Sequence, residues 1–341
     1  MILNLNKNLV PRLITILVFA LTLLSCSEQL TSNRPYILTT ATTGGTYYPV
    51  GVAIATITKS KLQPTQGISL SAISSAGSLE NIKLLRDKQA QFALLQGIFA
   101  AWAWRGEGPI RNPQSHLRSI GAMWNNVEHF VLLTEYVGKG TISDLNVLDG
   151  QRYVLGGRNS GAEQTGIFIL DQLGIDFRNK FELAYMGYGA TADKIQDGNI
   201  VGMNIPAGAP VSAITRAYAV LGDKMTVLSF NDEELKQING RYPLWDYYDL
   251  PAGTYPNQRE LIRSIAHPNI LAVHADVSDE VVYQVTKTLW DNLPSLHEIH
   301  QATRDMDLSK ALKGIGAPLH PGAVRYYREK GLAIPPELLL E

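Results

Sequence analysis

Residues 160–166 constrain the fold most, because they start a helix directly after a strand and a tight glycine turn. An apolar run ends at Leu155, and residues 156–159 read Gly-Gly-Arg-Asn. Ser160 and Glu163 have the spacing of a capping box, in which hydroxyl and carboxylate satisfy free N–H groups at a helix start. The positive end of such a helix would face a carboxylate, phosphate or sulfate. The alternative is that the turn and cap serve the helix alone.

The same pattern occurs three times in the first third of the chain. A strand at residues 36–39 runs into a Gly/Thr-rich loop, with Pro49 placed for the first turn of a helix. A strand at 68–73 is followed by Ser78, which we expect to be the N-cap of the next helix. A third strand at 92–95 ends at Gln96. Alternating strands and helices predict a parallel sheet, in which all these loops lie at one edge.

From His129 the strand–helix alternation restarts, which predicts a second α/β domain at 129–229. We expect residues 35–128 and 230–341 to form the first lobe, with the C-terminal tail packing back onto it. A ligand cleft would then lie between two lobes. We expect the hinge near residues 124–130 and 229–240.

Composition excludes several classes of protein. Of 341 residues, 45% are hydrophobic and 18% are charged, so a full core can be buried. The net charge of −1 offers no basic stripe for nucleic acid. A single cysteine excludes an intrachain disulfide framework.

The N-terminus has the features of a secretory signal. Lys7 and Arg12 precede an apolar run at 13–24, and Cys26 follows Ser25. This end resembles the lipobox of bacterial lipoproteins, which would make residues 1–25 a signal peptide, Cys26 the lipidated residue and 26–34 a tether. The alternatives are an uncleaved anchor helix or ordinary signal cleavage. Removing 1–25 leaves 28 basic and 31 acidic residues, a charge of −3. We expect a periplasmic or extracytoplasmic location.

Six motifs, in order, resemble one family. They are the tether at 26–34, Thr-Gly-Gly-Thr-Tyr-Tyr-Pro at 43–49, the Gly-Ser-Leu-Glu-Asn run at 77–81, the strand at 91–97, Pro-Ala-Gly-Thr-Tyr-Pro at 251–256 and His-Pro-Gly-Ala-Val-Arg-Tyr-Tyr at 320–327. Together they are similar to the TAXI family, the TRAP-associated extracytoplasmic immunogenic solute-binding proteins, over nearly the whole mature chain.

The resemblance implies a type II periplasmic-binding-protein fold, α/β in class, with two lobes around a ligand. It also implies a partner, the membrane permease of a tripartite ATP-independent periplasmic (TRAP) transporter. Characterised relatives bind glutamate, glutamine or 2-oxoglutarate. No cofactor is expected, and we expect a monomer. The family's ligand-binding loops fall on these residues: Thr42, Gly44, Gly45, Thr46, Tyr47, Ser75, Ala76, Gly77, Ser78, Ser160, Gly161 and Ala162.

This sequence departs from the family pattern in the second lobe. Asn159 replaces a glycine and Ala162 replaces a threonine, which removes a hydroxyl. Arg158 stands where proline is common, and Asn204 begins a segment that differs from the usual Gly-Gly-Tyr-Pro. We expect Arg158 to assist in binding a carboxylate, and we include Asn204 in the site.

Two further residues stand at strand ends. Gln96 would contact the ligand or satisfy backbone groups. Trp124 would cover the ligand or lie at the hinge. His297 and His300 lack the HExxH spacing, so no metal site is expected there.

The sequence does not favour an enzyme. It has neither a GxSxG nucleophile motif nor a dinucleotide-binding fingerprint. The remaining alternative is the same binding fold serving an ATP-driven (ABC) transporter or a sensor.

Overall fold

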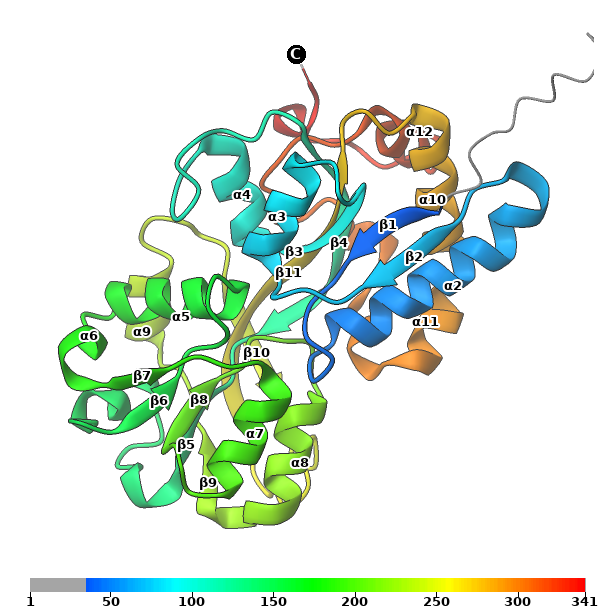
Figure 1. Cartoon of the computed structure of the whole chain (residues 1–341). Coiled ribbons are helices and arrows are strands. Elements are labelled where there is room, and N and C mark those ends of the chain that lie inside the picture. Colours follow the sequence, from blue (N-terminus) through cyan, green and yellow to red (C-terminus); the bar gives the residue numbers. More distant parts are fainter. Residues whose placement is uncertain (1–34, 341) are drawn as a thin grey trace, which may run out of the picture. The chain divides into compact units, whose positions relative to one another are not determined.

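The computed structural model describes residues 35–340, whose strands form two β-sheets (Figure 1). The predicted signal peptide 1–25 and the tether 26–34, including Cys26, lie outside the described residues. None of the helices within 35–340 is both long and apolar enough to cross a bilayer.

The first sheet combines parallel and antiparallel strands. β1 pairs in parallel with β2 and β3, as the strand–helix alternation predicts. β11 departs from that prediction, because it runs antiparallel to both β3 and β4 and separates them. Its direction is set by the return of the chain from the second sheet and not by a strand–helix unit. The strands are β1 (Tyr36–Thr39), β2 (Leu70–Ile73), β3 (Phe92–Gln96), β4 (Leu117–Val127), β10 (Asp246–Leu250) and β11 (Ile262–His274).

Helices cover both faces of this sheet, and β3 is buried between them. Phe92 and Leu94 belong to the core beneath α2 and α10, whereas Ala93 and Leu95 belong to the core beneath α3 and α4. This alternation follows from the two-residue period of a strand. The helices are α2 (Tyr47–Gln66), α3 (Ser78–Arg86), α4 (Gly97–Arg105), α10 (Asp279–Asp291), α11 (Leu293–Ile299) and α12 (Pro321–Glu329).

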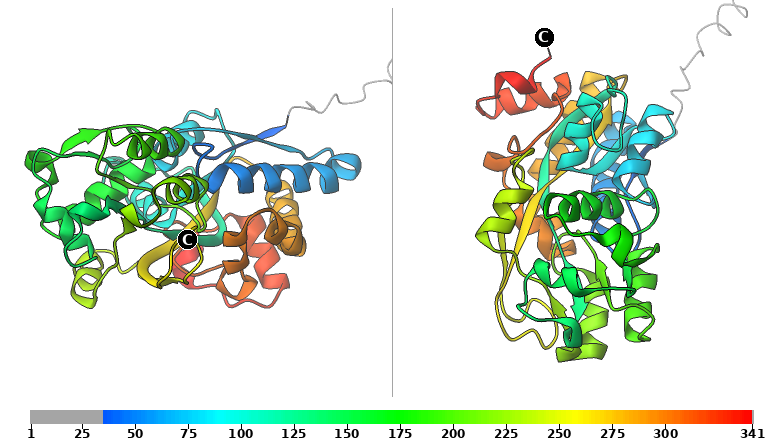
Figure 2. Two further views of the ribbon diagram at one scale, coloured as in Figure 1. Left: turned by 90° about the horizontal axis from the view of Figure 1, so that it is seen from below. Right: turned by 90° about the vertical axis from the view of Figure 1, so that its left-hand side faces the viewer.

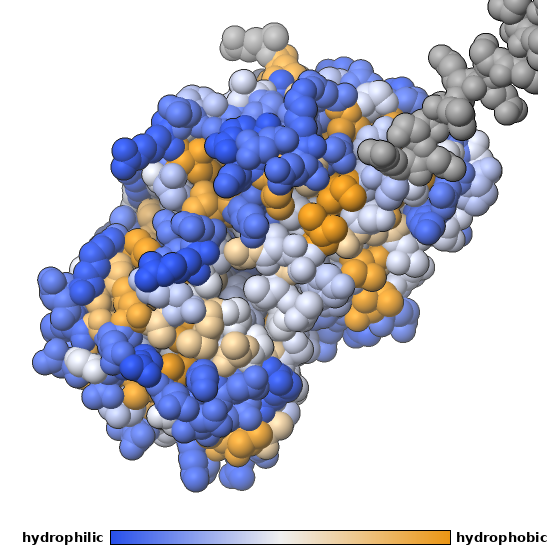
Figure 3. All heavy atoms as spheres, viewed as in Figure 1, coloured by the Kyte–Doolittle hydropathy of each residue, from blue (hydrophilic) through white to orange (hydrophobic). Residues whose placement is uncertain are grey.

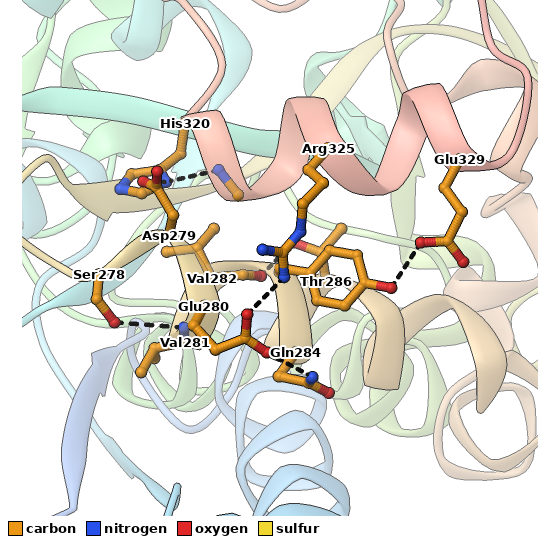
Figure 4. Close-up of polar contacts among 12 residues, drawn as sticks. Ser278, Asp279, Glu280, Val281, Val282, Gln284, Thr286, His320, Arg325 and Glu329 are labelled. Carbon is orange, nitrogen blue, oxygen red and sulfur yellow. Dashed lines mark hydrogen bonds and ion pairs between the residues drawn. The ribbon is translucent and has the colours of Figure 1, made fainter.

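The C-terminal segment packs back onto the first sheet, as expected. The Tyr327 hydroxyl donates to the Ile120 carbonyl at 2.9 Å. At the surface, α12 is joined to α10 by the Arg325–Glu280 ion pair at 2.7 Å and by the contact of Tyr283 with Glu329 at 2.6 Å (Figure 4).

The second sheet is smaller and has the order β7-β6-β8-β5-β9. β6 is parallel to β7 and β8, and β5 is antiparallel to β8 and β9. Its strands are β5 (Phe130–Leu133), β6 (Arg152–Val154), β7 (Glu182–Ala184), β8 (Gly202–Asn204) and β9 (Met225–Val227). The helices of this part are α5 (Gly161–Gln172), α6 (Phe177–Lys180), α7 (Tyr188–Gln196), α8 (Ser212–Leu221) and α9 (Asp232–Ile238).

Short 3-10 helices fill the remaining connections. They are η2 (Thr134–Tyr136), η3 (Ile142–Val147), η4 (Gly222–Lys224), η5 (Gln301–Asp305), η6 (Leu308–Lys310) and η7 (Pro336–Leu338).

The chain crosses between the sheets in two places. It enters the second sheet between Val127 and Phe130 and leaves it after Val227. In the right-hand view of Figure 2 most of the green elements of the second sheet lie below the blue and red elements of the first. The lobe boundaries at residues 128 and 229 are close to these crossings and stay a prediction.

Candidate ligand-binding site

A cavity of about 180 Å³ lies between the two sheets. The face seen in Figure 3 is pale at its middle, where residues of intermediate hydropathy gather between the two parts. Both sheets contribute to the lining, and ten of the predicted site residues are among it: Thr42, Thr46, Tyr47, Ala76, Gly77, Ser78, Gln96, Ser160, Gly161 and Ala162.

Five helices begin at this cavity. The N-cap residues of α2, α3, α4, α5 and α7 all line it: Thr46, Gly77, Gln96, Ser160 and Gly187. Each of these helices follows a strand that pairs in parallel with a neighbour in its own sheet, so the loops gather at the carboxyl edges of the two sheets. The first turn of every helix has N–H groups without an intrahelical partner and carries a partial positive charge. The cavity is therefore surrounded by groups that favour an anion.

The start of α5 has the predicted cap. The Ser160 hydroxyl accepts from the Glu163 N–H at 3.1 Å. The Glu163 carboxylate reaches one residue further back than in a capping box and accepts from the Asn159 N–H at 2.6 Å. Gly156 has a φ of 130°, and a Cβ there would lie 2.7 Å from that of Ala162. The turn therefore needs glycine to bring the helix start this close to β6.

Ser78 has a different role from the predicted one. The helix begins at Ser78 itself, and Gly77, with φ 113°, is the N-cap. The Ser78 hydroxyl accepts from the Gln96 N–H at 3.0 Å, which joins the start of α3 to the end of β3. The expectation that Ser78 caps α3 was wrong, because its hydroxyl is used between two loops.

Several contacts join the two sheets around the cavity. The Thr46 hydroxyl donates to the Gly208 carbonyl at 2.7 Å, and the Ser212 hydroxyl donates to the Gly44 carbonyl at 2.9 Å. The Thr165 hydroxyl contacts the side-chain oxygen of Gln96. The described arrangement is therefore closed over the cavity.

Six predicted residues lie outside the lining, and three of these support it. Gly44 and Gly45 lie against Tyr188. The Ser75 hydroxyl accepts from the Gly77 N–H at 3.0 Å and so shapes the second loop.

The other three lie behind the cavity or beside it. Trp124 is fully buried and packs edge-on against Tyr47, with ring centroids 5.9 Å apart. The Asn204 amide donates to the Ala162 carbonyl at 3.4 Å. The Arg158 guanidinium stacks 3.9 Å from the ring centroid of Tyr185, so the structure does not bring it into the lining.

Sequence reasoning missed six lining residues: Ala41, Gly157, Gly187, Tyr188, Pro206 and Ala207. Gly187 and Tyr188 had a usable signal, because the sequence predicts a strand at 182–186 and a helix at 190–197, and these two residues lie in the loop between them. The Tyr188 hydroxyl donates to the Pro206 carbonyl at 2.9 Å and joins two of the missed loops.

A buried carboxyl group lies at the crossing between the sheets. Glu128 is fully buried, and burial raises its pKa to about 8. Its neighbour His129 is also buried, and burial lowers the pKa of the imidazole to about 4. Both side chains are therefore uncharged at pH 7.

The sequence of residues 38–331 matches the NMT1-like family. The chain belongs to the NMT1-like family. The predicted periplasmic-binding-protein fold is confirmed by its likeness to solved structures. One is MatC from Rhodopseudomonas palustris with bound malate, with a TM-score of 0.52, 10% identity and coverage of 79% of this chain and 88% of that one.

Two more structures show the same fold. The periplasmic binding protein BugD has a TM-score of 0.50 and 14% identity, with 87% of this chain and 93% of that one covered. A protein described as a periplasmic transporter has a TM-score of 0.50 and 11% identity, with 81% and 88% covered. This NMT1-like chain thus shares its fold with periplasmic solute-binding proteins.

Proposed function

We propose that this chain is an extracytoplasmic solute-binding receptor that captures a small carboxylate metabolite of the glutamate, glutamine or 2-oxoglutarate type. The observation that carries the proposal is the cavity between the sheets, at which five helices begin. N–H groups at helix starts bind anions without a charged side chain. The donors are held in place by the folded loops, which limits the ordering cost of binding.

The carboxylate would dock at the start of α5, on Ser160 and Gly161. Hydroxyls of the first sheet would hold the other end of the ligand, with Thr42 and Thr46 foremost. The cavity would open by rotation near residues 124–130 and 229–240. A ligand that binds the closed form better shifts the population toward it.

The partner in this proposal is the membrane permease of a TRAP transporter, as the TAXI-like motifs imply. The chain would be a periplasmic lipoprotein, held at the membrane through a lipid on Cys26, and a monomer without enzymatic activity. The alternative is the same receptor serving an ABC transporter or a sensor. A fused permease gene beside this gene would support TRAP, and a kinase gene would support a sensor.

Thermal unfolding of the full chain tests the binding proposal. The ligand panel holds L-glutamate, L-glutamine, 2-oxoglutarate, succinate and neutral sugars as a control. A ligand at 100 times its dissociation constant stabilises the folded state by about 2.7 kcal/mol, which raises the melting temperature by several degrees. We expect such a shift with at least one carboxylate and none with the sugars. Mass spectrometry of the denatured chain detects a ligand retained from expression. If neither method finds a carboxylate, the proposal fails.

A further inference from the structure

The cavity lining holds no charged side chain of either sign among the described residues. Its polar groups are hydroxyls, one amide and the backbone of glycine-rich loops. A cationic group on a ligand would therefore have no carboxylate of the lining to pair with. The electrostatic environment is set instead by helix starts, whose partial charge is positive. That environment favours carboxylates and disfavours ammonium groups.

The acidic residues next to the lining are already engaged. The Glu80 carboxylate accepts from the Ala76 N–H at 2.5 Å. The Glu163 carboxylate accepts from the N–H of Asn159 and from the Gln164 amide at 3.3 Å. Both carboxylates stabilise the loops that carry lining residues, and neither lines the cavity itself.

A third acidic residue, Glu128, is fully buried and lies close enough to Tyr188 that a negative charge on it would raise the pKa of the tyrosine hydroxyl. Because burial raises the pKa of Glu128 to about 8, its carboxyl group is neutral at pH 7. It provides no negative charge behind the cavity.

One lining hydroxyl is available for a neutral polar group. The Thr42 hydroxyl oxygen is buried and has no hydrogen-bond partner among residues 35–340. A hydroxyl can donate to a carbonyl oxygen or accept from an alcohol. It would suit the substituent next to the carboxylate of an oxo or hydroxy acid.

We infer that the ligand is a small 2-oxo or 2-hydroxy carboxylate without an ammonium group, and not an amino acid. This inference rests on the proposed function and narrows its ligand class. It is carried by the uncharged lining, the engaged carboxylates and the free Thr42 hydroxyl. The cavity volume of about 180 Å³ suits a small metabolite.

Matched ligand pairs test the inference by titration calorimetry. The full chain, stripped of bound ligand by reversible unfolding, is titrated with 2-oxoglutarate and L-glutamate, with L-malate and L-aspartate, and with pyruvate and L-alanine. The members of each pair are similar in size, so the ammonium group is the main difference. An unpaired buried charge is strongly unfavourable, so we expect the ammonium-free member of the binding pair to bind at least 100-fold more tightly.

The two proposals fail in different ways. If an amino acid binds as tightly as its ammonium-free counterpart, the inference is wrong and the receptor function stands. If none of the six compounds binds, the receptor proposal for small carboxylates fails, and the inference fails with it.

A pair of threonine variants tests the hydroxyl. Thr42→Val keeps the shape of the side chain and removes its hydroxyl, so we expect about a 5- to 10-fold loss of affinity for the ammonium-free ligand. Thr43 is exposed and does not line the cavity, so Thr43→Val is the matched control and should bind like the wild type. If both variants bind the ammonium-free ligand with equal affinity, the Thr42 hydroxyl does not contribute to recognition of the substituent.

Discussion

At the scale of single residues, Glu128 should control how stability depends on pH. Its pKa is near 4.5 when exposed and about 8 when folded, so the folded state binds more protons in this window. The contribution of the Glu128 carboxyl to the unfolding free energy is therefore largest below about pH 4.5 and is lost as the pH rises through about 8. We expect Glu128→Gln to remove a slope of up to about 1.4 kcal/mol per pH unit. Urea unfolding of both proteins between pH 6.5 and 8.5 measures this slope of the unfolding free energy against pH.

That pH range also separates Glu128 from two buried histidines. Burial lowers the pKa of His129 and of His267 to about 4, so their contribution to stability rises with pH between about 4 and 6.5 and is constant above. Above pH 6.5 the difference between wild type and Glu128→Gln therefore reports the carboxyl group alone. Parallel stability curves for the two proteins would contradict the buried, protonated state of Glu128.

Arg158 is a second residue whose role can be measured. The sequence predicts that it assists the carboxylate, but its guanidinium lies over Tyr185 and not among the lining residues. We expect Arg158→Ala to change ligand affinity by less than about threefold, because a stacked surface cation contributes little to a site it does not touch. Titration calorimetry with the carboxylate of the panel that binds most tightly measures this change in affinity. A tenfold or greater loss of ligand affinity would show that Arg158 does contribute to binding.

At the scale of elements, the cap of α5 should affect both stability and binding. Replacing a serine N-cap by alanine costs about 1 kcal/mol of unfolding free energy. Ser278 is the matched control, because it caps α10 by accepting from the Val281 N–H at 3.4 Å (Figure 4) and is not among the residues that line the cavity. Urea unfolding and calorimetry should show that Ser160→Ala lowers stability and weakens binding about fivefold. Ser278→Ala should lower stability only. Unchanged affinity of Ser160→Ala would show that ligands do not depend on this cap.

The strands and helices also show which parts of this fold can be predicted from the sequence. The strand–loop–helix units were predictable, because each has an apolar run, a Gly/Ser/Thr loop and a helical apolar period within a few residues. The loop before Tyr188 has the same signal, and the structure places Gly187 and Tyr188 in the cavity lining. The position of β11 was not predictable, since pairing with β3 and β4 joins segments that are far apart in the chain. Local patterns do not encode such a pairing.

The placement of Arg158 and Ser78 was beyond sequence reasoning for a related reason. Spacing located both side chains within a turn of a helix start, but their directions depend on neighbours from other elements. The Arg158 guanidinium stacks on the Tyr185 ring, and the Ser78 hydroxyl accepts a hydrogen bond from the Gln96 N–H. Such tertiary contacts decide which residues of a predicted loop face the cavity.

At the scale of the whole molecule, closure over the ligand depends on a close approach at Gly44. A Cβ added there would lie 2.8 Å from the Gly189 nitrogen and 3.2 Å from the Tyr188 Cβ, both on the helix that follows β7. The backbone of Gly44 also accepts from Ser212. Gly44→Ala should therefore hinder the closed arrangement while leaving each sheet folded.

Small-angle scattering with and without ligand measures this closure. We expect the wild type to become more compact when a panel carboxylate binds, and Gly44→Ala to remain expanded and to bind at least tenfold more weakly. Gly138→Ala is the control, because a Cβ there meets the Asp144 carboxylate at 3.4 Å, an ordinary contact outside the cavity lining. A Gly44→Ala protein that compacts like the wild type would show that the approach at Gly44 does not limit closure. A wild type that binds without compaction would refute closure itself, and the ligand would then have to enter an arrangement that is already closed.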